Sequence, residues 1–123
     1  MAILKAFKGL RPPVEIVKQL ASRPYDVLNS DEARIEAANN PYSLLRVTKA
    51  EIDLPKDVDV HSQEVYDKVV ENFATFRKNN WLVQDNEEKL YIYAQTMDGR
   101  TQYGIVGCTS IEDYFENRIK KHE

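Results

Sequence analysis

The sequence predicts a small α+β fold in which a small mixed or antiparallel sheet, with a β-hairpin near the C-terminus, is packed by one long and several short helices. Two observations support this prediction. Residues 63–78 place apolar side chains at intervals of four, four and three, which is the period of an amphipathic helix. Residues 90–109 contain two strand-like runs joined by Asp98-Gly99, the dipeptide favoured by a type I′ turn.

Length and composition narrow the class of protein. The chain has 123 residues, which fits a single α+β module with one modest core. The net charge of −3 gives no long-range attraction for nucleic acid or for an anionic membrane, and no apolar run is long enough to span a bilayer. We therefore expect a cytoplasmic protein that binds neither. The single cysteine, Cys108, excludes an intramolecular disulfide, and its apolar surroundings in the sequence predict a buried core residue.

The first third of the chain predicts a strand and two helices. Residues 3–7 alternate weakly, which predicts a short strand. A helix begins near Pro13 and ends before Pro24, because a proline disfavours helical backbone at the residue that precedes it. Residues 29–30 (Asn-Ser) offer a cap for a second helix at residues 31–38. Its apolar face consists mostly of alanines, so we expect it to lie against a flat neighbour.

The middle of the chain predicts a strand, a loop and the longest helix. Residues 43–48 have the apolar and β-branched content of a strand. Residues 49–61 carry a proline and mixed charges without any period, which predicts a long loop. A loop of this length inside a compact domain is more often functional or mobile than merely connecting. Ser62 then caps the helix at residues 63–78.

The Asp98-Gly99 turn predicts the register of the hairpin. With these two residues as the turn, Tyr93 faces Gly104 and its ring covers that bare position, while Ile92 faces Ile105. We expect the face that carries the two isoleucines to lie on the core. The opposite face, which carries two glutamines, is the wetter one.

The predicted strands combine into one sheet. We expect residues 3–7, residues 44–48 and the hairpin to form a mixed sheet that the long helix covers on one side. Ser110 and Asp113 have the spacing of a capping box and predict a last helix through Phe115.

Residue patterns alone give few signals of chemistry. The glycines follow neither of the two common phosphate-binding spacings. His61 follows Asp57 and Asp59, which is a conceivable metal-binding set, although such loops are more often simply solvated. His122-Glu123 is able to supply a general base, or is an ordinary pair of polar residues near a terminus.

The loop at Arg23-Pro24-Tyr25-Asp26 lies between two predicted helices. Its proline fixes φ, so the loop is expected to be stiff and to hold its polar side chains in place. Two interpretations remain open. Tyr25 is either a packed wall residue in a stiff connection, or part of a binding surface together with its charged neighbours.

Several stretches, in this order and at these spacings, resemble a known family. They are residues 8–13 (Lys-Gly-Leu-Arg-Pro-Pro), 23–28 (Arg-Pro-Tyr-Asp-Val-Leu), 40–43 (Asn-Pro-Tyr-Ser), 95–100 (Gln-Thr-Met-Asp-Gly-Arg) and 119–123 (Ile-Lys-Lys-His-Glu). Together they are similar to the start of a large, mostly uncharacterised family, domain of unknown function 1015 (DUF1015). Members of that family are longer, roughly 400 residues, which is the length of several domains. The resemblance therefore implies the N-terminal segment of a longer protein.

The resemblance also implies a function. The downstream part of the family carries an Asp-Gly-His-His-Arg motif and resembles the ParB/sulfiredoxin-like fold, whose members include ATP-dependent kinases of free serine. In those relatives a glutamate that follows a histidine is thought to act as the base, and the matching pair here is His122 and Glu123.

We expect this segment to be an accessory part of such a kinase, without activity or a cofactor of its own. ATP and Mg²⁺ would then bind to the full-length protein, together with a small-molecule substrate. The residues expected to bind substrate or to support the site are Arg11, Arg23, Tyr25, Asp26 and Tyr42. The alternative is a non-catalytic module that binds a ligand or a protein and has a regulatory role.

Overall fold

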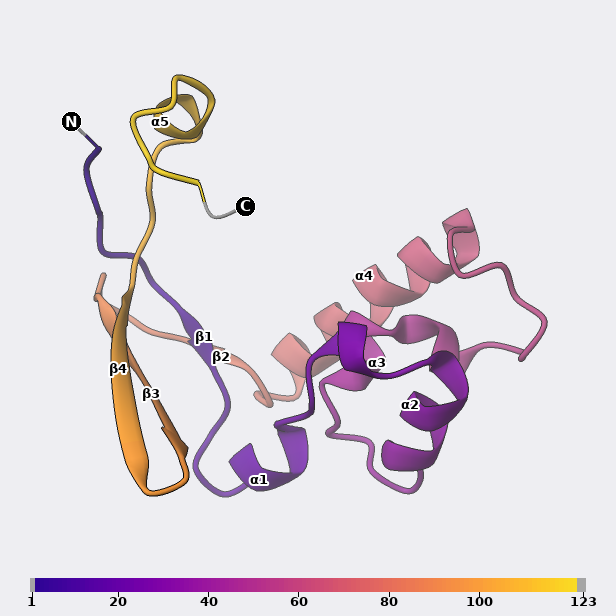
Figure 1. The fold of residues 1–123 in the computed structure, drawn as a ribbon. Coiled ribbons are helices and arrows are strands. Elements are labelled where there is room, and N and C mark those ends of the chain that lie inside the picture. The colour runs from indigo at the N-terminus through magenta and orange to yellow at the C-terminus, as the bar shows by residue number, and fades with distance from the viewer. Residues whose placement is uncertain (1, 122–123) are drawn as a thin grey trace. The chain divides into compact units, whose positions relative to one another are not determined.

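The computed structural model describes residues 2–121, and these form two compact units (Figure 1). The helical unit consists of residues 10–83. The hairpin unit consists of the described residues of 1–9 and 84–123. The architecture is a small α+β fold with one long and several short helices and a C-terminal hairpin, as the sequence predicts. Its strands form two small sheets. Within residues 2–121, no helix is long and apolar enough to cross a membrane.

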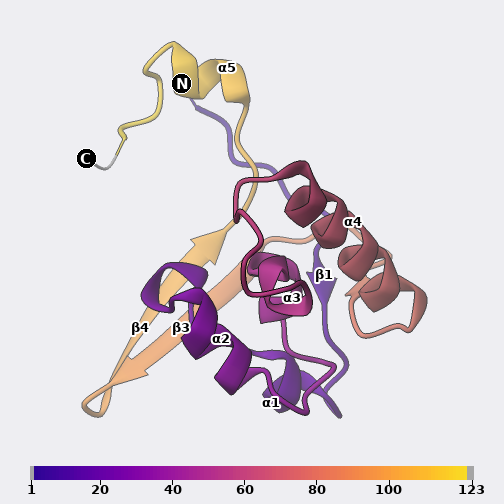
Figure 2. The same ribbon diagram turned by 90° about the vertical axis from the view of Figure 1, so that its right-hand side faces the viewer.

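The helical unit contains short helices around one long one (Figure 2). In chain order its elements are α1 (Val17–Leu20), the 3₁₀-helix η1 (Tyr25–Val27), α2 (Ser30–Glu36), α3 (Leu45–Thr48), the 3₁₀-helix η2 (Ala50–Asp53) and α4 (Gln63–Lys78). The short strand β1 (Leu10–Arg11) pairs with β2 (Val83–Gln84).

Helix α2 begins with the cap that the sequence predicts. Asn29 Oδ1 accepts a hydrogen bond of 2.8 Å from the main-chain N–H of Glu32, and the Glu32 carboxylate accepts one from the N–H of Asn29 in return. The alanines of this helix form its buried face: Ala33 and Ala37 pack with Leu28 and Leu45 in the core. The predicted alanine face is therefore the buried face of this helix.

The long helix α4 has the bounds that the sequence predicts. Its apolar stripe buries Val65 and Phe76, and the helix packs against α3 and η2. Helix α1 is shorter than expected. It covers only four residues, and Val14, which the pattern assigns to its apolar face, is 86% exposed. A turn closed by a hydrogen bond from Ile16 N–H to Pro13 O takes the place of the predicted first turn.

The prediction of a strand at residues 43–48 is wrong. Residues 45–48 are helix α3, and the loop that follows contains η2. The Ser43 hydroxyl accepts a hydrogen bond from the Leu45 N–H, which favours the start of a helical turn. The Arg46 carbonyl accepts a hydrogen bond of 2.7 Å from the Asn72 side chain on α4. The contact with Asn72 comes from a side chain 26 positions away in the sequence, and it helps to override the weak strand preference of the segment.

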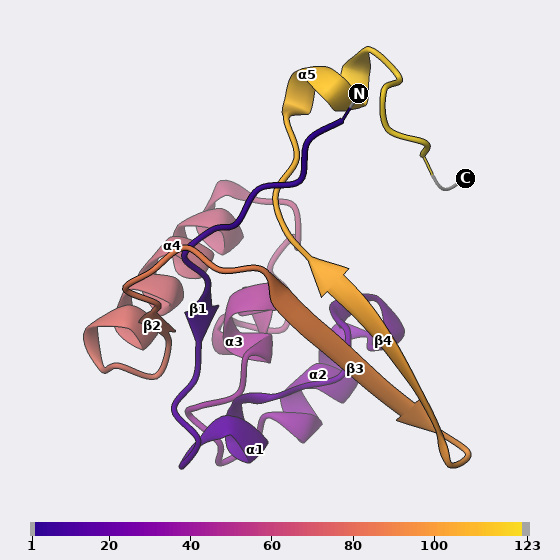
Figure 3. The same cartoon turned by 90° about the vertical axis from the view of Figure 1, so that its left-hand side faces the viewer.

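The hairpin unit contains β3 (Tyr91–Met97), β4 (Arg100–Val106) and α5 (Ile111–Phe115), as Figure 3 shows. The register is the predicted one, including the pairs Ile92 with Ile105 and Tyr93 with Gly104. Asp98 and Gly99 both have positive φ, of 52° and 76°, as a type I′ turn requires. Helix α5 begins where expected, because the Ser110 hydroxyl accepts a hydrogen bond from the Glu112 N–H.

Three expectations for this unit are wrong. The isoleucine face of the hairpin is not buried: Ile92 is 76% exposed and Ile105 is 69% exposed. The Tyr93 ring does not cover Gly104, since no atom lies within 4 Å of the position that a Cβ would take there. Cys108 is exposed, because it follows β4 outside the hairpin and pairs only with Lys5 in an isolated bridge.

The single mixed sheet also does not form. Residues 44–48 are not a strand, and residues 3–7 contribute two isolated bridges, Lys5 with Cys108 and Phe7 with Lys89. Hairpin strands β3 and β4 therefore form a two-stranded sheet of their own.

Candidate functional site

A cavity of about 490 Å³ lies in the helical unit beside Tyr25, and we call it the Tyr25 cavity. Apolar side chains from the start of α4 and the loop before it form part of its wall. Its lining consists of Tyr25, Asn29, Ser30, Thr48, Lys49, Ala50, Glu51, Val60, His61, Val65, Tyr66 and Val69. An apolar cavity of this size with a few polar groups is typical of small-molecule sites.

Glu51 is the buried charge of this cavity, with a relative exposure of 5%. Ser30 Oγ donates a hydrogen bond of 2.9 Å to Glu51 Oε1, and the Lys49 ammonium lies 3.2 Å from the same oxygen. Burial acts to raise the pKa of Glu51. Hydrogen bonds from its own main-chain N–H, from Ser30 and from Lys49, with the positive charge of Lys49, outweigh burial, and the net pKa is lowered. Glu51 is therefore ionised, and its ion pair with Lys49 leaves this wall neutral.

Three polar side chains of the Tyr25 cavity are open to a ligand. Tyr25 and Tyr66 are 61% and 52% exposed, and their hydroxyl groups have no hydrogen-bond partner among the described residues. The imidazole of His61 is likewise unpartnered within residues 2–121. Two phenols and an imidazole can donate and accept hydrogen bonds at the rim of an apolar hollow.

The Asp59 carboxylate is hydrogen-bonded to the main chain at His61. Asp59 Oδ1 accepts a hydrogen bond of 2.9 Å from the main-chain N–H of His61. Within residues 2–121, no three His, Cys, Asp or Glu side chains are grouped so that they could hold a metal ion. The residues described here therefore do not fit a metal centre.

The residues of the Arg23–Asp26 loop do not all lie at the Tyr25 cavity. Arg23 Nε and Nη2 donate hydrogen bonds of 3.0 and 2.8 Å to one carboxylate oxygen of Glu36 on α2. The hydrogen bond to Glu36 and the negative charge of Glu36 raise the pKa of Arg23. This ion pair ties the loop to α2, and only Tyr25 of the predicted loop residues lines the cavity. Asp26 is exposed in η1.

The remaining predicted site residues lie elsewhere. Arg11 is exposed in β1, and Tyr42 is half-buried with its ring edge-on to Trp81, at 4.9 Å between ring centroids. Neither lines the Tyr25 cavity. The proposed catalytic pair, His122 and Glu123, lies outside the described residues.

Several residues of the site were not predicted. Lys49, Glu51 and His61 all belong to the segment 49–61, and its length was the signal that pointed to function. Ser30 was interpreted only as a helix cap. The periodicity of residues 63–78 places Tyr66 beside the apolar stripe of α4, where nothing in the pattern distinguishes it from a core residue.

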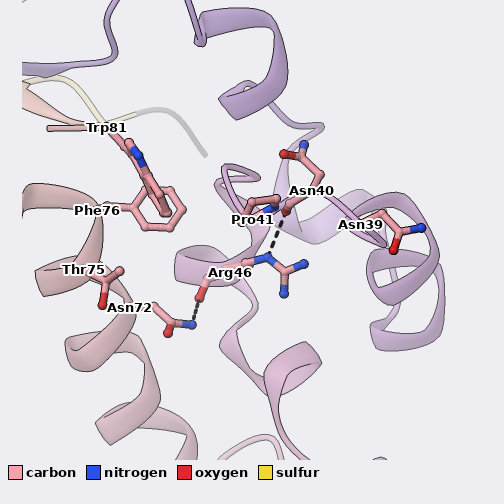
Figure 4. A pocket seen from close by; sticks show the side chains of 8 residues that line it. All are labelled: Asn39, Asn40, Pro41, Arg46, Asn72, Thr75, Phe76 and Trp81. Carbon is pink, nitrogen blue, oxygen red and sulfur yellow. Dashed lines mark hydrogen bonds between the residues drawn. The ribbon is translucent and has the colours of Figure 1, made fainter. Parts of the chain in front are cut away.

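A second cavity of about 450 Å³ lies in the same unit, and we call it the Trp81 cavity (Figure 4). It is lined by Asn39, Asn40, Pro41, Arg46, Asn72, Thr75, Phe76 and Trp81. The guanidinium of Arg46 donates hydrogen bonds to Asn40 O at 3.0 Å and Ala37 O at 2.8 Å, and it pairs with the Asp53 carboxylate. The charge in this wall is therefore also compensated.

Comparison with known proteins identifies the family. No curated protein and no solved structure matches the chain. The sequence profile of DUF1015, described as a protein of unknown function, matches residues 4–123. The match covers nearly the whole chain, and it includes both the Arg23–Asp26 loop and the Asn40–Ser43 stretch. The chain therefore belongs to the DUF1015 family.

Proposed function

We propose that residues 1–123 are the N-terminal accessory segment of an ATP-dependent kinase that phosphorylates free serine or a similar small alcohol. Membership of DUF1015 supports this proposal, together with the resemblance of the family's downstream part to ParB/sulfiredoxin-like kinases. The observation that supports an accessory role is the Tyr25 cavity. All of its lining residues lie within residues 10–83, so this segment has a candidate ligand site of its own. In this proposal the segment binds or positions the small molecule and does not transfer phosphate alone.

The proton transfer would be the task of Glu123. Its carboxylate would accept the proton of the substrate hydroxyl as that oxygen attacks the γ-phosphoryl group. ATP with Mg²⁺ supplies the phosphoryl group and the cation that offsets its charge. The described residues offer no grouped metal ligands, so we assign no magnesium or phosphate contact to them.

The test uses the full-length protein with ATP and free serine. Glu123→Gln is expected to lower phosphoserine formation by at least about a hundredfold, since a positioned general base contributes a factor of this order. His122→Asn is expected to keep part of the activity. Full activity of the Glu123→Gln variant would refute the assignment of the base. Serine-dependent ATP turnover by residues 1–123 alone would refute the accessory role.

A second candidate function is a non-catalytic module that binds a ligand and regulates a partner domain. This function is favoured by three side chains of the Tyr25 cavity that have no hydrogen-bond partner within residues 2–121, namely Tyr25, Tyr66 and His61. They can bind a ligand by hydrogen bonds without taking part in a reaction. A full-length protein that binds a small molecule but transfers no phosphate to any small alcohol would select this function.

A further inference from the structure

We propose that the Trp81 cavity binds a neutral planar heterocycle of the nucleobase type. This site is distinct from the Tyr25 cavity, because the two cavities share no lining residue. Its volume of about 450 Å³ lies within the range of small-molecule sites, roughly 300–1,000 Å³.

Aromatic side chains form one wall of the cavity. Figure 4 shows Trp81 and Phe76 on one side and Pro41 across from them. The Trp81 ring is held edge-on by two neighbours, with ring centroids 5.1 Å from Phe76 and 4.9 Å from Tyr42. Aromatic rings fixed in this way offer planar ligands a stacking surface with little loss of side-chain freedom.

The charge of the cavity favours an uncharged ligand. Its one guanidinium, Arg46, is already occupied by the Asp53 carboxylate and by the carbonyl oxygens of Ala37 and Asn40. A phosphate or carboxylate would have to displace these bonds. A neutral ring leaves them intact.

Several hydrogen-bonding groups of the lining remain available. The Asn72 amide uses both of its N–H groups, on Arg46 O at 2.7 Å and on Asp53 Oδ2 at 2.9 Å, so its oxygen is left as an acceptor. The Thr75 hydroxyl donates to Glu71 O at 3.1 Å and can still accept. The indole N–H of Trp81 and the side-chain amide of Asn39 have no partner within residues 2–121. Donors and acceptors beside an aromatic wall match the edge of a nucleobase.

The Asn40-Pro41-Tyr42-Ser43 stretch, which does not line the Tyr25 cavity, builds the wall opposite α4. The Asn40 side chain donates a hydrogen bond of 2.7 Å to Gln19 O and accepts one of 3.1 Å from the Tyr42 N–H. Pro41 lines the cavity, and the ring of Tyr42 fixes Trp81. This stretch therefore has a direct structural role in shaping a ligand site.

Trp81 provides a specific readout, because it is the single tryptophan of the 123-residue chain. Titration of this chain with adenosine is expected to quench the tryptophan fluorescence and to shift the single indole N–H resonance, both in a saturable manner. Ribose and inorganic phosphate are expected to cause neither change. Absence of a saturable change with adenosine, or an equal change with ribose or phosphate, would overturn the proposal.

Two variants test whether the ligand contacts the lining residues of the Trp81 cavity. Thr75→Val removes an acceptor from an exposed position on α4, and Asn39→Gly removes an amide at a position where φ is 60°, which glycine adopts easily. Each is expected to weaken adenosine binding about fivefold, the effect of one lost hydrogen bond. Asn117→Gly is the matched control, because Asn117 also has a positive φ, of 59°, but lies in the hairpin unit. Unchanged affinity in both test variants would contradict this site.

Because residues 1–123 are used without ATP, the outcome is separate from that of the kinase test. Adenosine binding at Trp81 with no phosphoryl transfer by the full-length protein would support this inference and refute the kinase. The reverse result would refute this inference alone.

Discussion

The hydroxyl oxygen of Tyr91 accepts a hydrogen bond of 2.7 Å from the main-chain N–H of Gly9. The same hydroxyl donates to the Asp85 carboxylate, and the ring packs on Phe7 with centroids 5.0 Å apart. These contacts join the N-terminal residues of the hairpin unit to the start of β3 and to the segment before it. Gly9 is buried, so the approach of Tyr91 depends on the absence of a side chain there.

We predict that Gly9→Ala destabilises the hairpin unit by about 1–3 kcal/mol, the usual cost of overpacking. A Cβ at this position would lie 2.7 Å from the Tyr91 hydroxyl oxygen and 2.8 Å from the ring carbon that bears it. The ring cannot retreat without losing its hydrogen bonds to Gly9 and Asp85. The free energy of unfolding in urea, followed by amide resonances of β3 and β4, measures the effect.

Gly104→Ala is the matched control for this variant. No atom lies within 4 Å of the Cβ position at Gly104, and its φ is not positive. Alanine there is expected to change the stability by less than about 0.5 kcal/mol or to raise it slightly. Equal destabilisation by both alanines would show that the Tyr91 contact is not the cause.

The hairpin and the long helix were predictable because their signals are local. A two-residue Asp98-Gly99 turn permits one register, and a regular apolar stripe marks the extent of α4. The cap predicted at Ser62 is wrong, because the Ser62 hydroxyl makes no hydrogen bond to the main chain at the start of α4. The helix at residues 45–48 was not predictable in this way. Its contacts with Asn72 span 26 positions of the sequence, and a strand-like composition contains no sign of them. The exposure of Ile92 was missed because alternation distinguishes two faces but does not show whether another layer covers either.

The candidate site was predictable only in part. The stiff loop at residues 23–26 points to Tyr25, and the length of segment 49–61 points to function without singling out His61. The structure brings both residues to one cavity. Glu51 looked like one charge among several in a mixed-charge loop. Its burial depends on a hydroxyl donor 21 positions away, at Ser30, so it emerges only from the fold.

We predict that the stabilising effect of Glu51 depends on pH. The pKa of this carboxyl is lowered from the ordinary value of 4.5, so the unfolded chain takes up its proton at higher pH than the folded chain does. Stability from Glu51 is therefore fully present above the unfolded pKa and is lost as the pH falls through the folded pKa. The difference in unfolding free energy between wild type and Glu51→Gln is expected to be largest near neutral pH and to shrink below about pH 4.

Urea unfolding over a range of pH values tests this prediction. Glu15→Gln serves as the control, because Glu15 is exposed and makes no ion pair among the described residues. Its difference from wild type is expected to stay small, because the substitution removes no ion pair. A Glu51→Gln difference that does not vary with pH would contradict the lowered pKa.

We predict that Asn72→Ala destabilises the helical unit by about 1–3 kcal/mol. The Asn72 amide joins α4 to Arg46 O and to the Asp53 carboxylate, and its removal leaves two half-buried acceptors without this donor. Gln63→Ala is the control on the same helix, since its amide binds only the exposed Asp67. Thermal unfolding followed by circular dichroism compares the two. Similar losses for both variants would show that the hydrogen bonds of Asn72 to Arg46 O and Asp53 are not the cause.

The role of Tyr25 in the proposed kinase leads to the last prediction. In the full-length protein, Tyr25→Ala is expected to raise KM for the small alcohol about fivefold to tenfold, because one hydrogen bond and one aromatic contact are lost. The side chain is 61% exposed, so its removal should leave the fold intact. We expect kcat to stay unchanged, since the proposed base, Glu123, is a different residue. Tyr103→Ala, at a 71% exposed position on the hairpin, provides the control. A fall in kcat with unchanged KM would instead place Tyr25 at the reacting atoms.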